Sequence, residues 1–442
     1  MQFFFTRRVF LGLLVATFTT AALSARAQAG PSTNYTFTVM TDRPEAIYKK
    51  GQTVTFTVKL LLDGKPLHNA EVNWKIAKDG MPPIESGKLT LPDGTGKVTG
   101  KLREAGFLQC TATFQTPTTT LTAMGGAAID PLKIKPSLPV PRDFDTFWAA
   151  QKKSLAAVPV NSRLIPVKSS DKGIEAFDLQ ADSIGAPVSG YFARPIAAKP
   201  KSLPIILTVH GAGVRSSNLG GAIGWTKRGF LALDINAHGL PNGKPDKFYS
   251  ELAAGRLKDY RSEGRESRDT IYFKGMFLRL VRALDFLTAQ PEWDGKIVVV
   301  SGSSQGGAQA IVAAGLDPRV TFFAAGVPAM CDHTGIVVGR INGWPKFIPH
   351  HPNEEPNPKV VAAVRYYDAM NFATRTKAAS IVTVGFIDAT CPPTSVYAAY
   401  NALKGKKEIF NDPPSGHRMS PSAGNAMQNA VLQHVEQMKQ NK

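Results

Sequence analysis

Residues 297–307 read IVVVSGSSQGG, and few folds accommodate such a succession of residues. The β-branched run Ile297–Val300 does not alternate with polar residues, which is typical of a strand buried on both faces of a parallel sheet. A G-x-S-x-G motif around Ser304 follows, and then an Ala-rich segment that favours a helix. A strand, a sharp turn and a helix form the context in which this motif is a nucleophile elbow. The alternative is an ordinary Gly/Ser loop between a strand and a helix.

Strands and helices alternate on both sides of this motif. Apolar runs predict strands, and amphipathic periodicity predicts helices. Residues 174–180 and 188–195 are expected to pair as antiparallel strands. Further strands are predicted at 205–209, 230–235, 321–327, 380–386 and 408–410, with helices at 275–287 and 423–439. This alternation predicts an α/β fold of the α/β-hydrolase type, with a mostly parallel sheet covered by helices on both faces, over residues 142–442.

The N-terminal third has a different texture. Residues 31–129 alternate apolar residues with threonine and contain turn signals at short intervals, without helical periodicity. This predicts a small immunoglobulin-like β-sandwich, with Trp74 as a core residue. The sandwich is interpreted as a spacer or packing domain, and a carbohydrate-binding module is the alternative. Proline-rich residues 130–141 predict an extended linker.

A helix is predicted directly after this linker. Asp143 stands where a side chain would cap the first turn, and Phe144, Phe147 and Trp148 fall on one face. That face is expected to pack into the core.

The first 27 residues have the pattern of a signal peptide. Arg7 and Arg8 precede an apolar run, and Ala25-Arg26-Ala27 provides a cleavage pattern. The weakly apolar run favours the twin-arginine route over the general one. The mature protein is expected to be periplasmic or secreted from a bacterium, with no membrane association after cleavage.

Charge and cysteine content narrow the range of partners. The formal charge is +18, and removing residues 1–27, with three arginines and no acid, leaves +15. The lysines are scattered, so nucleic acid is not expected as a partner; acidic polysaccharide is weighed against an ordinary solvated surface. Cys110, Cys331 and Cys391 are an odd number, and a bond between the last two is left open. No metal-ligand spacing occurs, so neither metal nor cofactor is predicted.

A reactive serine needs a base and an orienting carboxylate. On this fold the order is Ser, Asp or Glu, His, each at the carboxyl end of a strand. Asp388 follows the predicted strand 380–386, and His417 follows the predicted edge strand 408–410. Ser304, Asp388 and His417 are therefore the predicted triad. Asp332 is the rival acid because it also follows a strand.

The other polar groups of the site are predicted from the same order. The oxyanion hole is expected to use the backbone amides of Gln305 and Ala212. His210 and His238 precede Ser304, which is the wrong order for the base, and His210 is expected to shape the oxyanion loop instead. His68 and His434 are expected to be solvated. Ordinary loop residues are expected at His333, His350 and His351, and lining of the pocket is the alternative.

With these residues identified, the chain from 141 to 439 resembles the acetyl xylan esterase and cephalosporin C deacetylase group of α/β-hydrolases, carbohydrate esterase family 7. The likeness rests on four motifs: Asp143-Phe144-Asp145-x-Phe147-Trp148, Arg282-Ala283-x-Asp285-Phe286, Gly302-x-Ser304-Gln305-Gly306-Gly307 and Asp388-x-x-Cys391-Pro392-Pro393. The chain departs from the family pattern at Ala212, at Asn236-Ala237-His238-Gly239 and at Arg418.

The resemblance implies removal of acetyl groups from O-acetylated sugars and xylo-oligosaccharides by Ser304, Asp388 and His417, without a cofactor. An oligomer is compatible with it, although the N-terminal module would obstruct a ring-shaped one. Two alternatives remain: a peptidase or other acyl hydrolase on the same fold, and a catalytically idle polysaccharide-binding protein.

Overall fold

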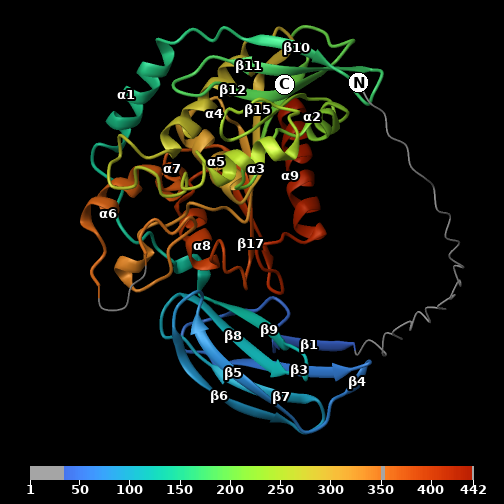
Figure 1. Ribbon diagram of the computed structural model, residues 1–442, viewed down its shortest axis with the longest axis vertical. Helices are drawn as coiled ribbons and strands as arrows, with labels where there is room; N and C mark the ends of the chain where they lie inside the picture. Colours follow the sequence, from blue (N-terminus) through green and yellow to red (C-terminus); the bar gives the residue numbers. More distant parts are fainter. Residues whose placement is uncertain (1–33, 350–353, 441–442) are drawn as a thin grey trace, which may run out of the picture.

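The computed structural model describes residues 34–349 and 354–440, which form two parts packed against each other (Figure 1). The predicted signal segment, His350 and His351 lie outside these residues. Among the residues that are described, no helix is long and apolar enough to cross a membrane.

The smaller part is all-β and consists of two sheets around a core of its own. One sheet contains β1 (Tyr35–Thr41), β3 (Val54–Leu62), β4 (Lys65–Pro66) and β7 (Thr95–Gly100). The other has the order β2 (Ile47–Tyr48), β9 (Thr120–Ile129), β8 (Gly106–Gln115), β5 (Ala70–Lys78) and β6 (Pro83–Leu91). Burial alternates along β3 and β5, as period-two patterning requires. Trp74 is half-buried against this core. The immunoglobulin-like assignment stays a prediction.

The larger part is organised around a nine-stranded sheet. Its order is β10 (Arg163–Val167), β11 (Ile174–Ala181), β12 (Val188–Pro195), β14 (Leu231–Ile235), β13 (Leu203–Val209), β15 (Trp293–Ser303), β16 (Phe322–Gly326), β17 (Ala379–Gly385) and β18 (Lys407–Asp412). The pairs from β10 to β14 are antiparallel, and those from β14 to β18 are parallel. The predicted α/β fold is confirmed.

Helices cover both faces of this sheet, because alternate residues of each buried strand point to opposite sides. In β13, Ile205 and Leu207 belong to the core beneath one set of helices, and Ile206 belongs to the core on the other face. The first set includes α1 (Phe144–Ala156), α4 (Phe273–Thr288), α5 (Gln305–Leu316), α6 (Pro358–Val364), α7 (Ala369–Ala373) and α8 (Pro393–Ala402). The other face is covered by α2 (Leu219–Thr226) and α9 (Pro421–Gln440). Helix α3 (Asp246–Ala254) lies in the connection between β14 and α4.

The start of α1 corrects one prediction. Asp143 occupies the N-cap position, but its side chain makes no capping hydrogen bond. Its carboxylate instead accepts hydrogen bonds from Arg268 and from the hydroxyl of Tyr366, which are contributed by distant segments. The predicted apolar face is buried, with Phe144, Phe147 and Trp148 all inside the core.

The proline-rich segment 130–141 is not simply extended. It contains a 3₁₀ turn, Pro131–Lys133, and is fixed at several points to the larger part. The side-chain nitrogen of Asn401 in α8 donates to the carbonyl oxygens of Pro131 and Ile134, both at 2.9 Å. Ser137 donates from its amide and hydroxyl to the carboxylate of Asp332. These bonds fix the segment to the larger part.

A buried carboxylate links the two parts directly. Asp79, which follows β5, accepts hydrogen bonds from the amide and the hydroxyl of Thr394 in α8, at 2.9 and 2.7 Å. Burial is the main cause that raises the pKa of Asp79 from 3.8 to about 7. The folded protein therefore binds a proton at this group in a pH range where the unfolded chain has released it.

This linkage gives a testable sign for the pH dependence of stability. The contribution of Asp79 is fully present below about pH 4 and is lost as the pH rises through about 7. Asp79→Asn cannot ionise, so we expect its free energy of unfolding relative to wild type to increase between about pH 5 and about pH 8. Urea denaturation at both pH values measures the difference, and a difference that does not change with pH would contradict the assignment.

Candidate active site

The turn between β15 and α5 holds Ser304 in an unusual backbone conformation. Ser304 has φ 58° and ψ −122°, a region that residues with a side chain rarely adopt. There is no room for side chains on either flank. A Cβ on Gly302 would lie 2.6 Å from the carbonyl of Gly306, and one on Gly306 would lie 2.1 Å from the carbonyl oxygen of Val209. The glycines of the motif therefore permit the turn, and Ser304 takes the strained position at its apex.

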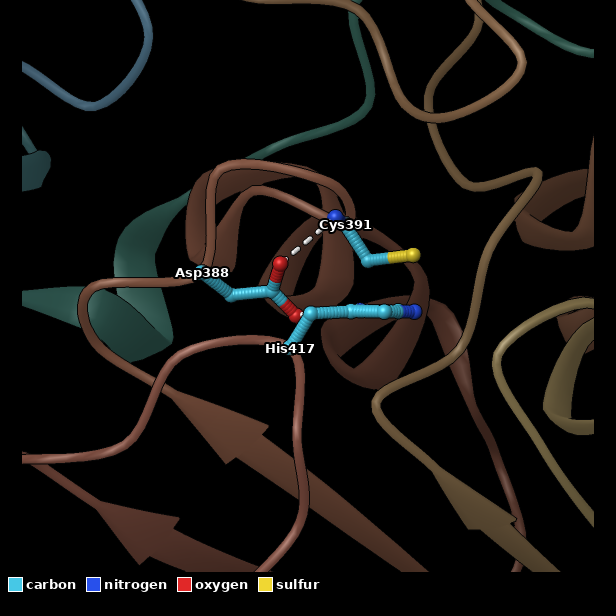
Figure 2. Close-up of side chains that lie close together, drawn as sticks. All are labelled: Asp388, Cys391 and His417. Carbon is cyan, nitrogen blue, oxygen red and sulfur yellow. Dashed lines mark hydrogen bonds and ion pairs between the residues drawn. The ribbon is translucent and has the colours of Figure 1, made fainter. Parts of the chain in front are cut away.

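Three segments that are distant in sequence meet at this turn. The Nε2 atom of His417 lies 2.9 Å from the hydroxyl oxygen of Ser304, and its Nδ1 atom lies 2.9 Å from a carboxylate oxygen of Asp388. Asp388 follows β17, and His417 follows β18, the edge strand of the sheet. Figure 2 shows the imidazole ring extending from the carboxylate towards the side on which the thiol of Cys391 lies. The structure thus brings together the three residues of the predicted triad.

The carboxylate is held by the chain around it. Oδ1 of Asp388 accepts hydrogen bonds from the amides of Thr390 and Cys391, at 2.8 and 2.9 Å, which leaves Oδ2 for the imidazole. The side chain is 1% exposed. An ionised carboxylate can only accept, so it selects the tautomer of His417 with the proton on Nδ1. Nε2 is then the acceptor that faces the hydroxyl of Ser304.

Among the described residues, one group of potential metal ligands has its ligand atoms within 4.8 Å of one another. It consists of Asp388, Cys391 and His417. Both ring nitrogens of His417 are already engaged in hydrogen bonds. Burial raises the pKa of the Cys391 thiol well above its usual value, so the thiolate that a metal prefers is disfavoured. The arrangement suits proton transfer better than metal binding. All three cysteines of the chain are free and buried.

Gln305, directly after Ser304, opens α5 and is fully buried. The hydroxyl of Tyr260 donates to its side-chain oxygen at 3.0 Å. Tyr260 in turn packs edge-on against His238, which is hydrogen bonded to the hydroxyl of Tyr272. Burial lowers the pKa of His238 to about 3, so this ring is neutral at physiological pH. Tyr260 therefore restrains the side chain of Gln305. The backbone amide of the same residue lies at the positive end of the helix dipole.

The loop after β13 passes on the other side of Ser304. A Cβ on Gly211 would lie 3.4 Å from the Cβ of Ser304 and 3.3 Å from the carbonyl oxygen of Ser303. Ala212 is the next residue along this loop. Nδ1 of His210 lies 2.6 Å from the carbonyl oxygen of Gly211, and burial lowers the pKa of His210 to about 4. His210 is thus a neutral residue within this loop.

The rival acid and two histidines lie elsewhere. Asp332 is fully buried and pairs with Arg340 and Ser137. His333 lies in the loop after β16, where it is fully buried with its ring against Phe347. His434 is partly buried, because it stacks on Phe322 and is hydrogen bonded to Thr321.

Sequence reasoning missed two features of the site. Tyr260 lies in a stretch with no motif, and its contact with Gln305 spans 45 positions. The thiol of Cys391 lies beside the imidazole, whereas the sequence suggested only a disulfide partner. The position of Cys391 shortly after the acid in the Asp388-x-x-Cys391 motif was the one available signal.

Comparison with known sequences finds a family and a relative that match most of this chain. The sequence model of the acetyl xylan esterase (AXE1) family matches residues 128–434. The acetyl esterase Axe7A of Xylanibacter ruminicola is 33% identical over 393 residues, which cover 87% of this chain and 87% of that protein.

Solved structures give the same picture for the larger part. An acetyl xylan esterase from Paenibacillus sp. R4 superposes with a TM-score of 0.59 at 29% identity, covering 68% of this chain and 97% of that one. Acetyl xylan esterase 1 from Thermoanaerobacterium sp. JW/SL YS485 has a similar fold, with a TM-score of 0.56 at 22% identity, and covers 69% of this chain and 97% of that one. About a third of this chain therefore lies outside each match.

The imidazole–carboxylate bond predicts a spectroscopic signature. A proton shared between Nδ1 of His417 and Asp388 at 2.9 Å and shielded from water should give a proton resonance well downfield of the amide region. We expect this resonance to disappear in Asp388→Asn and His417→Gln. It should persist in His434→Gln, which alters a histidine on the far side of β16. A resonance that survives Asp388→Asn would contradict the contact.

Proposed function

Because the chain belongs to the acetyl xylan esterase family and is therefore a carboxylic ester hydrolase, we propose that it removes acetyl groups from O-acetylated sugars and xylo-oligosaccharides through an acyl-enzyme on Ser304. An acetyl esterase activity follows from the family. The serine mechanism and the sugar substrate are the proposal, as is export of the protein directed by residues 1–27.

The first half of the reaction uses the two hydrogen bonds at 2.9 Å. His417 accepts the hydroxyl proton at Nε2 while Ser304 Oγ forms a bond to the acetyl carbonyl carbon. The imidazolium that results is stabilised by Asp388. It then gives its proton to the sugar oxygen as the ester bond breaks, so the sugar leaves as an alcohol and the acetyl group stays on Ser304.

The second half repeats these steps with water. Nε2 of His417 takes a proton from a water molecule as the water oxygen attacks the acetyl carbon. When the tetrahedral species collapses, the proton passes back to Ser304 Oγ and acetate is released. The side chain of His417 is 32% exposed, so water can approach the imidazole.

Negative charge develops on the carbonyl oxygen in both halves. The amides of Gln305 and Ala212 are the donors we propose for it. The first lies at the start of α5, where the helix dipole favours an anion, and the second lies in the loop that passes Ser304. The observation that carries the whole proposal is the continuous hydrogen-bonded line from Ser304 through His417 to Asp388.

Acetate release from acetylated xylo-oligosaccharides tests the proposal. We expect Ser304→Ala to lower kcat by about 10⁶-fold and to abolish labelling by a fluorophosphonate probe. Ser303→Ala is the matched control, because it removes a hydroxyl from the adjacent serine, which contacts Met419 rather than His417. Equal rates for wild type and Ser304→Ala would refute the mechanism. Faster hydrolysis of aminoacyl anilides than of acetyl esters would instead favour a peptidase.

The contact of Tyr260 predicts a smaller effect at the same site. Tyr260→Phe keeps the ring but leaves the buried side-chain oxygen of Gln305 without its hydrogen bond, which costs about 1 kcal/mol or more. If the loss falls on the transition state, kcat decreases about fivefold to tenfold with little change in KM. Tyr35→Phe, in the sandwich, should leave both unchanged. An increase in KM alone would show that Tyr260 acts on substrate binding instead.

A further inference from the structure

The segment that carries Asp388 lies against the sandwich. In Figure 1 the sandwich lies directly below α8, the helix that follows this segment. The side-chain amide of Gln109, in β8, donates to the carbonyl oxygen of Phe386 at 2.8 Å, two residues before Asp388. Asp79 accepts two hydrogen bonds from Thr394, six residues after Asp388. The sandwich therefore holds this segment on both sides of the carboxylate.

Both anchors are excluded from water. Gln109 is 7% exposed, Asp79 is 3% exposed and Thr394 is 2% exposed. Removing one partner of a buried hydrogen bond leaves the other unsatisfied, so such contacts resist displacement more than surface contacts do. Both anchors are therefore buried hydrogen bonds rather than loose surface contacts.

Asp79 also provides the N-terminal capping bond that no residue at the start of α8 provides. The N-cap position of α8 is Pro392, which makes no side-chain capping bond. Thr394 is the second residue of the helix, and its amide donates to Asp79. A residue of the sandwich thus caps the helix that follows Asp388.

Close packing fills the space between the anchors. The ring of Phe107, in β8, lies edge-on to Phe386 at 5.0 Å and tilted to Tyr397 of α8 at 5.5 Å. Phe107 is counted with the core of the larger part rather than with that of the sandwich. A Cβ on Gly126, in β9, would lie 2.5 Å from the carbonyl oxygen of Phe386. The sandwich backbone is therefore in direct contact with the segment.

His417 belongs to a different segment, and its distance from Asp388 depends on how the two segments are aligned. The amide of Ile387 donates to Ser415 at 3.2 Å, and the amide of Phe386 donates to Asp412 at 3.4 Å. These hydrogen bonds continue the alignment set by the pairing of β17 with β18, which ends with Gly385 opposite Asp412. The contacts from the sandwich restrain the Asp388 segment from a second side, in addition to this pairing.

We propose that Gln109 and Asp79 are positioning residues for the reaction, and that the sandwich is a fixed support for the Asp388 segment rather than a spacer or a separate binding module. This inference rests on the proposed function, since it assigns the sandwich a role in the same site. It predicts that loss of either anchor impairs the chemical step without weakening substrate binding.

Two variants test the anchors separately. Gln109→Met keeps the length of the side chain but removes the donor to Phe386, and Asp79→Ala removes the cap of α8. For each we expect a decrease in kcat of about tenfold for an aryl acetate, with KM changed by less than about twofold. Asp79→Asn keeps one acceptor for Thr394 and should recover most of the activity. Glu71→Ala, which removes an exposed ion pair with Lys88 on the sandwich, is the matched control and should behave as wild type.

The downfield proton resonance of His417 gives a readout that does not depend on a substrate. We expect it to shift or broaden in Gln109→Met and Asp79→Ala, and to stay unchanged in Glu71→Ala. Variants that fold with the wild-type resonance and the wild-type kcat would overturn the inference. Should Asp79→Ala not fold, Thr394→Val tests the same anchor, because it removes the hydroxyl donor while keeping the amide and the volume.

The two proposals fail in different ways. If wild type, Gln109→Met and Asp79→Ala all release acetate at the same rate, the support role is refuted and the esterase mechanism is left intact. A wild-type protein that hydrolyses no ester, but whose resonance changes in these variants, would refute the esterase mechanism and support the positioning of Asp388 by the sandwich.

Discussion

The backbone of Ser304 is the constraint on which the rest of the site depends. A serine at φ 58° is held there only because the neighbouring glycines let β15, α5 and β13 approach to within backbone contact. The same turn sets the hydroxyl at the carboxyl edge of the sheet and the amide of Gln305 at the start of α5. Strain at one residue therefore fixes two functional groups relative to each other.

The other members of the site are brought to this turn by the parallel order of the sheet. Strands β15, β16, β17 and β18 are consecutive neighbours, so the segments after β17 and β18 emerge on the same edge as Ser304. Asp388 and His417 come from these segments. The antiparallel strands on the opposite side of the sheet contribute no residue to the hydrogen-bonded line from Ser304 to Asp388. Topology determines which loops can take part, and side-chain contacts determine their alignment.

Buried polar groups around the site are satisfied by partners from other segments. The carboxylate of Asp388 accepts hydrogen bonds from amides of its own turn. The side chain of Asp79 accepts them from Thr394, and the side-chain oxygen of Gln305 accepts one from the hydroxyl of Tyr260. In an interior of low dielectric such contacts are costly to leave unmade, so each specifies one arrangement of the segments it joins. The sandwich enters this network through Asp79 and Gln109, so it shares buried hydrogen bonds with the segment that carries Asp388.

The sequence by itself determined the α/β fold, the strand, tight turn and helix around Ser304, and the positions of Asp388 and His417 after the ends of strands. These features are local: a buried β-branched strand, glycines at a tight turn, and polar residues at strand ends. Tertiary structure alone decided that Asp143 binds Arg268 rather than capping α1, and that Tyr260 restrains Gln305. It alone decided that Gln109 is hydrogen bonded to Phe386, 277 positions along the chain, and that Asp79 is hydrogen bonded to Thr394, 315 positions along the chain. No local pattern encodes such pairs, because they arise only when separately formed elements pack and each buried polar group must find a partner.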